Sequence, residues 1–265
     1  LVCGLIICLA STWFVVNKLV GLKKDGTVVI AGKRSPEDSS IDKWTDIVDV
    51  SGEYDFTIGL KVDGTIVTKG ENSFDQYSYS TNIQNEVKTW TDIVEIATSY
   101  YYAVGLKADG TIVVTKVGQS EYYDYLYEAA DKWTDVISLS ASDAIFAGLK
   151  ADGTVYAISL NPEYVKINTS KWTDIVQIDV YGSHIVGLKS DGTVVATGEN
   201  FAEQCNVKKW KDIVAISTDY AHTVGLKADG TLVGTRYTGY EDPGEMPLYC
   251  GQCEFQDWKD IKLPE

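Results

Sequence analysis

Few residues in this sequence have the type and spacing that enzyme chemistry requires. Cys250 and Cys253 are separated by two residues, which is the spacing of a redox pair or of half a zinc site. His184 and His222 are the two histidines and could act as general acids or bases. The sequence contains no Gly-x-Ser-x-Gly, no phosphate-binding loop and no His-Glu-x-x-His. These two pairs are therefore the first candidates to weigh.

Two strings recur along the chain in a fixed register. One string begins with glycine and the other with tryptophan. Each tryptophan up to Trp210 precedes the glycine of the other string by fifteen residues, whereas the distance from that glycine to the next tryptophan varies. The constant part is expected to be structural core and the variable part loop. The string Gly-Leu-Lys-x-Asp-Gly-Thr starts at Gly21, Gly59, Gly105, Gly148, Gly187 and Gly225. The string Trp-[Thr/Lys]-Asp-[Ile/Val] starts at the expected structural residues Trp44, Trp90, Trp133, Trp172, Trp210 and Trp258.

One repeat, from Trp210 to Gly234, reads as antiparallel strands. Residues 213–216 and 223–227 are rich in β-branched residues, with a polar turn at 217–221 between them. Asp229-Gly230 predicts a two-residue type I′ hairpin, after which 231–233 runs back. Asn206-Val207 could add a short fourth strand. No segment shows a helical period or a capping box. Three or four strands per repeat predict an all-β fold, a β-propeller.

We expect one propeller domain over residues 1–265, with repeats beginning near residues 4, 44, 90, 133, 172 and 210. A C-terminal strand at 258–263 would close the ring, so that the blade count is six or seven. The tryptophans would pack between blades, and the glycine before Leu-Lys would mark close backbone approach near the axis. Residues 1–16 carry no charge, so they are either buried strands, which we favour, or the remnant of a signal peptide or anchor.

The repeat resembles that of the regulator of chromosome condensation (RCC1) family. The resemblance rests on Trp-x-Asp-Ile-Val and His-Thr-Val-Gly-Leu-Lys-x-Asp-Gly-Thr, with Gly198-Glu199-Asn200 and Gln204-Cys205 supplying the rest of the pattern. It covers almost the whole chain and looks most like the short bacterial form of the repeat. It implies a propeller fold. The family includes a guanine-nucleotide exchange factor that docks on chromatin, and propellers that clamp an enzyme with loops on one face.

The repeat changes how the chemical candidates are interpreted. The histidines share one repeat position, which Lys18, Phe56, Tyr102 and Ile145 fill elsewhere, and a position repeated in this way favours a scaffold role. Gln252-Cys253 likewise fills the place of Gln204-Cys205 one repeat earlier. The aspartate of each Asp-Gly pair is favoured by the turn itself. We therefore expect no enzyme activity, no bound metal and no cofactor.

Tyrosines at one repeat position are the positive sign of function. Tyr54, Tyr100 and Tyr220 each lie five residues before the repeat glycine, in the predicted loop between the first two strands. Tyrosine is a favoured anchor at protein interfaces. The candidate partner-binding residues are Tyr54, Tyr100, Asp143, Tyr181 and Tyr220, with Glu53 and Asp219 as an acidic rim. A second tyrosine cluster lies at 121–128, and in both places the tyrosines could merely pack loops together.

The charge balance bears on the partner. The formal net charge is −15, which argues against nucleic acid because that binding draws on clustered lysine and arginine. A protein partner, which could be basic, is the leading hypothesis, and a glycan is the alternative. An exchange factor or an enzyme sited in the channel ranks lower. We expect a monomer without a membrane partner, unless residues 1–16 are an anchor. The cytoplasm is favoured, with secretion or the cell surface left open.

Overall fold

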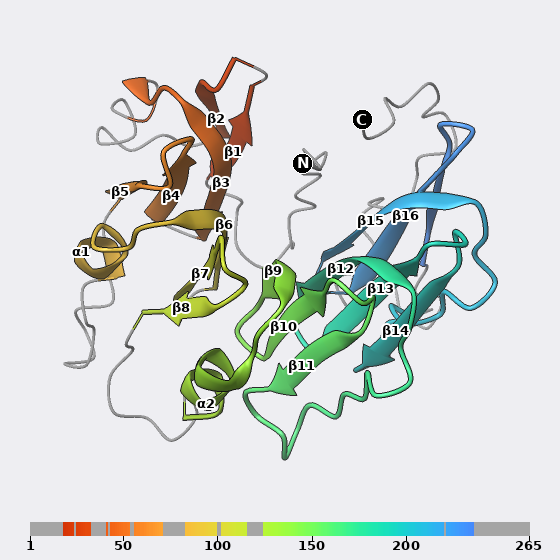
Figure 1. Cartoon of the computed structure of the whole chain (residues 1–265). Coiled ribbons are helices and arrows are strands. Elements are labelled where there is room, and N and C mark those ends of the chain that lie inside the picture. Colours follow the sequence, from red (N-terminus) through yellow and green to blue (C-terminus); the bar gives the residue numbers. More distant parts are fainter. Residues whose placement is uncertain are drawn as a thin grey trace, which may run out of the picture. The chain divides into compact units, whose positions relative to one another are not determined.

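The structure is a computed structural model. It describes residues 18–235, except 24, 33–40, 42, 54–55, 71–82, 100–101, 116–123 and 220. Within these residues the strands form one two-stranded and five three-stranded antiparallel sheets, and two short helices lie between them (Figure 1). The chain divides between Asp143 and Ala144 into two compact units, which are described separately. The prediction of an all-β fold made of small antiparallel sheets is confirmed.

The N-terminal unit contains the sheets β1-β2, β3-β4-β5 and β6-β7-β8, followed by β9. Each sheet is a meander in which neighbours in sequence are neighbours in space. The strands are β1 Lys18–Leu22, β2 Val28–Gly32, β3 Ile47–Glu53, β4 Phe56–Lys61, β5 Ile66–Gly70, β6 Ile93–Thr98, β7 Ala103–Lys107, β8 Ile112–Val114 and β9 Val136–Ala141. The helices are α1 Ile83–Val87 and α2 Asp124–Lys132.

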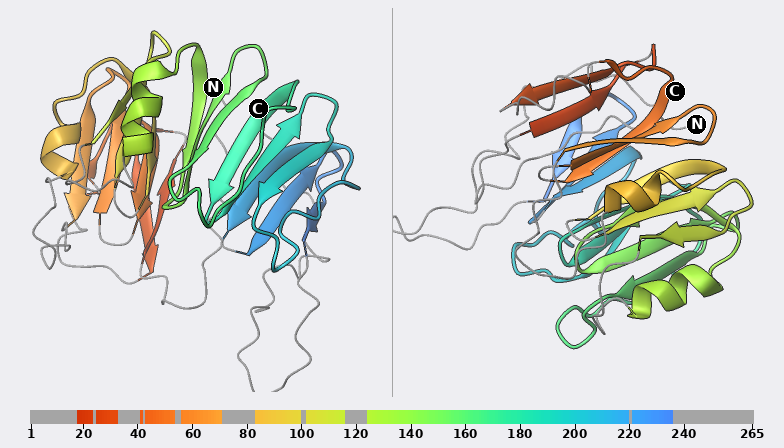
Figure 2. Two further views of the ribbon diagram at one scale, coloured as in Figure 1. Left: turned by 90° about the horizontal axis from the view of Figure 1, so that it is seen from below. Right: turned by 90° about the vertical axis from the view of Figure 1, so that its left-hand side faces the viewer.

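The C-terminal unit contains the hairpin β10-β11 and the sheets β12-β13-β14 and β15-β16-β17. Consecutive sheets are neighbours, because β12 contacts β10 of the hairpin before it and β15, the first strand of the next sheet (Figure 2). The strands are β10 Ile145–Lys150, β11 Val155–Ser159, β12 Ile175–Tyr181, β13 His184–Lys189, β14 Val194–Gly198, β15 Ile213–Asp219, β16 His222–Lys227 and β17 Leu232–Gly234.

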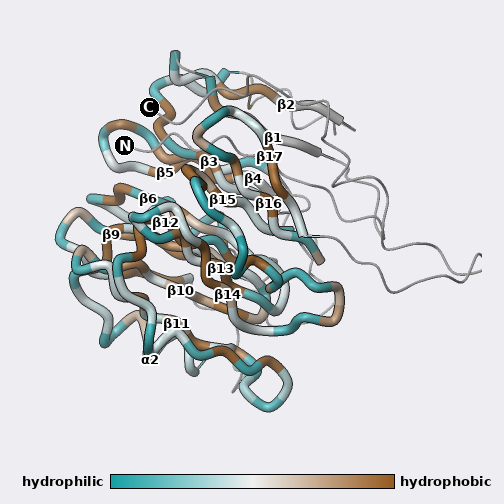
Figure 3. The backbone as a smooth tube through the Cα atoms, turned by 90° about the vertical axis from the view of Figure 1, so that its right-hand side faces the viewer, coloured by the Kyte–Doolittle hydropathy of each residue, from teal (hydrophilic) through white to brown (hydrophobic). Residues whose placement is uncertain are grey.

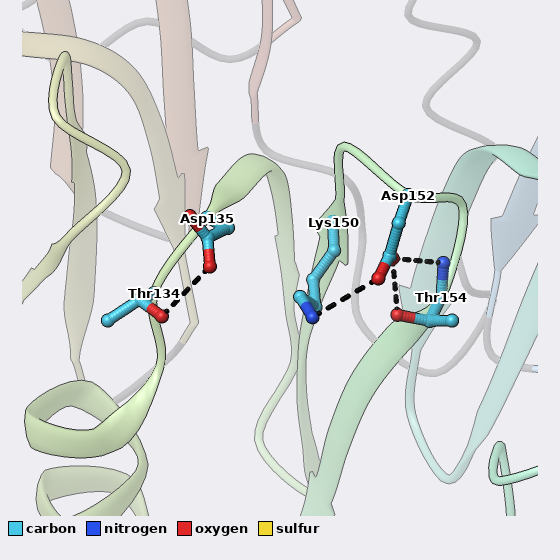
Figure 4. A network of polar contacts seen from close by, with 5 residues as sticks. All are labelled: Thr134, Asp135, Lys150, Asp152 and Thr154. Carbon is cyan, nitrogen blue, oxygen red and sulfur yellow. Dashed lines mark hydrogen bonds and ion pairs between the residues drawn. The ribbon is translucent and has the colours of Figure 1, made fainter.

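The Asp-Gly hairpin differs from the predicted type I′ turn. That turn needs positive φ at both central residues, but only the glycine has it, as at Gly153 with φ +77°. The loop therefore has three residues, closed by Gly153 N donating to Lys150 O at 3.0 Å. Asp152 accepts hydrogen bonds from Thr154 N at 2.9 Å and from Thr154 Oγ1 (Figure 4). These bonds lower the pKa of Asp152, and through them its carboxylate stabilises the turn.

Three further predictions about secondary structure are wrong. The first strand of the repeat at Trp210 runs to Asp219, so residues 217–219 extend the strand instead of starting a turn. Residues 206–207 are not in a strand, so this repeat has three strands. Helices α1 and α2 occupy the variable connections, where the expectation was loop. In α2, buried Leu126 and Ala129 are three residues apart on one helical face, a pattern too short to stand out in the sequence.

The repeated tryptophans lie between neighbouring sheets. Trp90 packs with Ile58 and Leu60 of β4 and with Ile93 of β6. Trp172 and Trp210 occupy equivalent clusters in the C-terminal unit. In Figure 3, hydrophobic stretches of the strands alternate with hydrophilic turns, which agrees with cores made between sheets. The core is thus divided into a series of similar layers rather than gathered at one centre.

The glycine before Leu-Lys was expected to mark close approach of the backbone near the axis. The structure gives a different reason, which is that the repeat tryptophan packs against this glycine. A Cβ built on Gly187 would lie 2.8 Å from Cζ3 and 3.0 Å from Cε3 of Trp172. The same overlap recurs at Gly59, Gly105 and Gly225 with the tryptophan of their own repeat. The glycine and the tryptophan are therefore one packing unit, which explains their constant spacing.

Successive repeats are also joined by a backbone hydrogen bond. The first residue of a new first strand donates its N–H to the hairpin glycine of the repeat before it, as Ile175 N does to Gly153 O at 3.0 Å. The preceding aspartate turns the chain with positive φ, at 62° in Asp174. The same arrangement recurs at Gly26 with Ile47, Gly64 with Ile93, Gly110 with Val136 and Gly192 with Ile213.

Several predictions fall outside the described residues: those on residues 1–16, on the closing strand at 258–263 with Trp258, and on Cys250 and Cys253. Within the described part of the chain, neither helix is long and apolar enough to cross a membrane.

Candidate partner-binding site

The loops that join first and second strands are short in the five repeats in which both strands are described. Tyr54, Tyr100 and Tyr220 fall in these loops but lie outside the described residues. Asp143 is exposed in the turn before β10, and Tyr181 is half-buried as the last residue of β12. These two residues are in different units, so each is placed only within its own. The partner-binding site at these tyrosines therefore remains a prediction.

The acidic rim is only partly placed. Glu53 ends β3 directly before the loop. Asp219 ends β15 but is only 2% exposed, which differs from the rim position expected for it. A carboxylate buried to this degree cannot contact a partner directly. It opposes His222 in the register of β15 and β16, so it belongs to the support of the loop.

The loops of the C-terminal unit are supported by side chains that bind the backbone of the next first strand. Gln177 of β12 donates to Ile216 O at 2.9 Å and accepts from Ile216 N at 3.0 Å. Asp179 accepts from Thr218 N at 2.6 Å and from Thr218 Oγ1 at 3.1 Å. These bonds satisfy backbone groups that the meander pairing of each sheet does not reach. They hold β12 and β15 in fixed register up to the loops.

In the N-terminal unit, acidic side chains form an equivalent ladder of hydrogen bonds from one first strand to the next. Asp49 accepts from Ile96 N at 3.1 Å. Glu95 accepts from Leu139 N at 3.0 Å and from Ser138 Oγ at 2.9 Å. Asp49, Glu95 and Gln177 each lie five residues after a repeat tryptophan, and sequence reasoning missed them. The available signal was a polar residue at one fixed position inside an otherwise apolar strand.

The Glu95 carboxyl has an unusual electrostatic setting. Burial raises the pKa of Glu95 to about 7, and the charge of Asp49 adds to this, while the hydrogen bonds from Leu139 and Ser138 oppose it. Burial also raises the pKa of Asp49. Glu95 is therefore about half-protonated near neutral pH. Its position within a structural ladder makes this a matter of stability rather than of proton transfer to a substrate.

The repeat position shared by the histidines is buried wherever it can be examined. Tyr102 is fully buried, and its hydroxyl donates to Ser142 O at 2.7 Å in the following strand-to-strand loop. His184 Nε2 lies 3.3 Å from Thr223 Oγ1, which in turn donates to Gln204 O at 2.8 Å. His222 is 4% exposed. These contacts favour a scaffold role for the position, because a substrate could not reach the imidazoles.

Acid should weaken the C-terminal unit through His184. Burial lowers the pKa of His184 to about 4, so the unfolded chain, with a histidine pKa near 6.5, binds more protons between these values. The contribution of the neutral imidazole is therefore lost as the pH falls below about 6.5. The free energy of unfolding of His184→Gln, relative to that of wild type, should rise by roughly 1 kcal/mol between pH 7 and about pH 5.5, as measured by urea unfolding. An equal change in both proteins would contradict this role.

Metal chemistry finds no support among the described residues. No group of three or more His, Cys, Asp or Glu side chains in this part of the chain is arranged to hold a metal ion. Cys205 is a free, half-buried thiol, and burial raises its pKa to about 11, so it is a poor nucleophile at neutral pH.

Comparison with solved structures identifies the fold. The CRINKLY WD40 ectodomain of the Arabidopsis thaliana receptor kinase ACR4 matches with a TM-score of 0.58 at 18% identity, over 83% of this chain and 77% of that one. WD40 structures are radial arrays of small sheets. The fold is a β-propeller. A second similar structure is the entire ectodomain of the Physcomitrella patens receptor kinase CR4, with a TM-score of 0.59 at 15% identity, over 87% of this chain and 62% of that one.

The propeller is also similar to yeast RCC1. Prp20p from Saccharomyces cerevisiae, whose structure was described with its binding to Gsp1p and histones, matches with a TM-score of 0.50 at 15% identity. The match covers 74% of this chain and 57% of Prp20p, so the chain spans little more than half of that protein. No protein-family model and no curated protein matches the sequence. At these identities the similarity shows the propeller fold alone.

Proposed function

We propose that the chain is a single propeller of RCC1-like repeats that binds another protein through the loops between first and second strands, without catalysis. One observation carries this proposal. These five loops, with the strand residue before each, contain three carboxylates besides the buried Asp219 and a set of tyrosines, but no lysine, arginine or histidine. Loops of this composition suit a basic protein surface, because tyrosine provides contact area and the carboxylates provide charge complementarity.

The ladder beneath the loops supports the proposal. Binding loops are most effective when a rigid scaffold positions them, since less conformational entropy is lost on association. The bonds that Thr218 donates to Asp179, and the bond that Tyr102 donates to Ser142, fix strand ends next to the loops. The yeast neighbour Prp20p, which binds Gsp1p and histones, shows that this fold can serve protein binding. We further propose that the ring has six or seven blades and is closed by residues 258–263.

Removing the loop tyrosines should abolish binding and leave the fold intact. We expect a variant with alanine at Tyr54, Tyr100, Tyr181 and Tyr220 to lose the partners that the wild-type chain captures from an extract of its source organism. Because Tyr181 is half-buried, a second variant keeps it and changes the other three. The melting temperature of this second variant should stay within about 2 °C of wild type.

The matched control is Tyr164→Ala. Tyr164 is 72% exposed and lies in the connection between β11 and β12, which is not one of the first-to-second strand loops. Capture should survive this change. Equal capture by the wild type and both loop variants would show that the wrong surface has been assigned.

A glycan is the second candidate ligand, because tyrosine faces with nearby carboxylates also stack on and bind sugar rings. A glycan array separates the two: binding of a defined sugar that the loop variants lose would replace the protein-binding proposal. Release of nucleotide from a small GTPase would similarly identify an exchange factor.

A further inference from the structure

One repeat position combines an aliphatic side chain with exposure to solvent. It lies four residues after each tryptophan, as the second residue of the first strand. Among the described residues, half of the large hydrophobic side chains that are exposed fall at this position. They are Val48 at 38%, Val94 at 52%, Ile137 at 54%, Val176 at 54% and Val214 at 36%. Single exposed aliphatics are common, but the same choice in five repeats needs a reason.

The strand geometry explains why this residue points outward. The pairing of β6 with β7 skips from Ile93 to Glu95, so Val94 is the extra residue of a β-bulge and has no partner across the ladder. The same skip occurs at Val48, Val176 and Val214. The flanking residues Ile93 and Ile96 are buried, at 3% and 5% exposure. Val94 lies outside the strand pairing and half of its side chain is exposed, so the fold would tolerate a polar residue at this position.

In the N-terminal unit these residues form a row. The first strands β3, β6 and β9 are consecutive neighbours, because β3 contacts β6 and β6 contacts β9 (Figure 1). The residues at this repeat position are Val48, Val94 and Ile137, which we call the bulge row. Each lies at the start of its first strand, whereas the proposed partner-binding loops follow the end of that strand. The two features therefore occupy opposite ends of the first strands.

The charges around the bulge row are nearly balanced. In the Asp-Gly hairpins and within two residues of each tryptophan, the described part of this unit has six lysines and seven aspartates. The lysines are Lys23, Lys43, Lys61, Lys88, Lys107 and Lys132. The aspartates are Asp25, Asp46, Asp63, Asp92, Asp109, Asp131 and Asp135. The same positions in the C-terminal unit have seven lysines and five aspartates. The charge of −15 is therefore concentrated elsewhere.

We propose that the bulge row and its hairpins form a self-association surface that binds a second copy of this chain. A second copy also carries a net charge of −15, so the two copies repel each other in most orientations. They can approach where the bulge row provides an apolar surface with nearly balanced charges around it. An isologous contact would place the bulge rows of the two copies together. Such a homodimer would leave the first-to-second strand loops of both copies free. This inference stands independently of the proposed function.

The dimer should be weak and favoured by salt. Three half-exposed aliphatic side chains supply little of the roughly 800 Å² per partner that a stable interface buries. Association is therefore expected to be reversible and visible only at high protein concentration. Salt screens the long-range repulsion between two acidic chains, while it does not weaken apolar burial. Raising the salt concentration should tighten the dimer several-fold, in contrast to an interface held by ion pairs.

Sedimentation equilibrium over a concentration series, at low and at high sodium chloride, tests this inference with the full chain. Wild type should approach the dimer mass at the highest concentrations and do so earlier in high salt. The double variant Val94→Asp/Ile137→Asp should remain monomeric throughout. The variant Val94→Lys/Ile137→Lys should also remain monomeric, which removes the sign of the added charge as an explanation. Circular dichroism establishes that the variants are folded.

The matched control is Val29→Asp, because Val29 is 40% exposed on β2 but lies outside the bulge row. This variant should associate as wild type does. A wild type that stays monomeric at every concentration and salt would overturn the proposal. So would a Val29 variant that loses association to the same extent as the bulge-row variants.

Discussion

Replacing Trp172 with alanine is expected to destabilise the protein by about 3–5 kcal/mol. The indole is 8% exposed and packs with Ile145, Leu149 and Val155 from one side and with Ile175 and Ile178 from the other. Its loss would leave a cavity between two sheets that the strand ladders prevent from collapsing. Urea unfolding followed by far-ultraviolet circular dichroism measures the change. The surface variant Tyr164→Ala should be unchanged within about 0.5 kcal/mol.

A double-mutant cycle isolates the pairing of Trp172 with Gly187. Gly187→Ala alone should cost about 1–3 kcal/mol, because its Cβ would lie 2.8 Å from the indole. Once Trp172 is alanine, that overlap is gone, and the same change should cost much less. Additive costs would mean that Gly187 is required for its backbone and not for the tryptophan.

Replacing Glu95 with glutamine is expected to stabilise the protein by about 3 kcal/mol at about pH 8 and by only about 1 kcal/mol at about pH 5. The folded-state pKa of Glu95 is raised from 4.5 to about 7, so the folded state binds more protons than the unfolded state between these values. The stability that this group contributes is therefore lost as the pH rises through that range. Glutamine is neutral at all these pH values and removes the effect.

The chain itself supplies the precedent for this substitution. Gln177 occupies the same repeat position and makes the equivalent bonds to the next first strand. Glu128→Gln is the control, because Glu128 is exposed and pairs only with the i+4 lysine, Lys132, at 2.9 Å. Unfolding free energies of the three proteins across pH 5–8 give the result. A stability difference for the Glu95 variant that does not depend on pH would show that Glu95 is not neutralised by burial.

The sequence predicted those parts of the fold that depend on repetition. Fifteen residues separate Trp172 from Gly187 because the indole covers the glycine, and the same contact recurs at Gly59, Gly105 and Gly225. The hairpin type could not be predicted in the same way, because Asp-Gly suits both a two-residue type I′ turn and the longer loop found here. The helix α2 was missed because it spans nine residues in a connection that no other repeat shares.

The candidate site could be predicted less well than the fold. Position in the repeat placed Tyr181 and Asp143 next to the first-to-second strand loops, but it could not show that Asp219 is buried beneath one of them. The ladder residues Glu95 and Asp179 were not recognised, because their partners are backbone groups of another repeat. Residues whose role depends on a neighbour far away in sequence leave little trace in the local pattern.

The hydrogen bond from each first strand to the hairpin glycine of the repeat before it has a consequence for how the chain acquires its structure. Only when its predecessor is formed can a repeat make this bond and complete the layer around its tryptophan. Folding should then begin with a first pair of repeats whose formation is unfavourable in free energy, and each further repeat should add more easily. A single excised repeat would stay a coil, whereas a change in one repeat would be felt most strongly by the next along the chain.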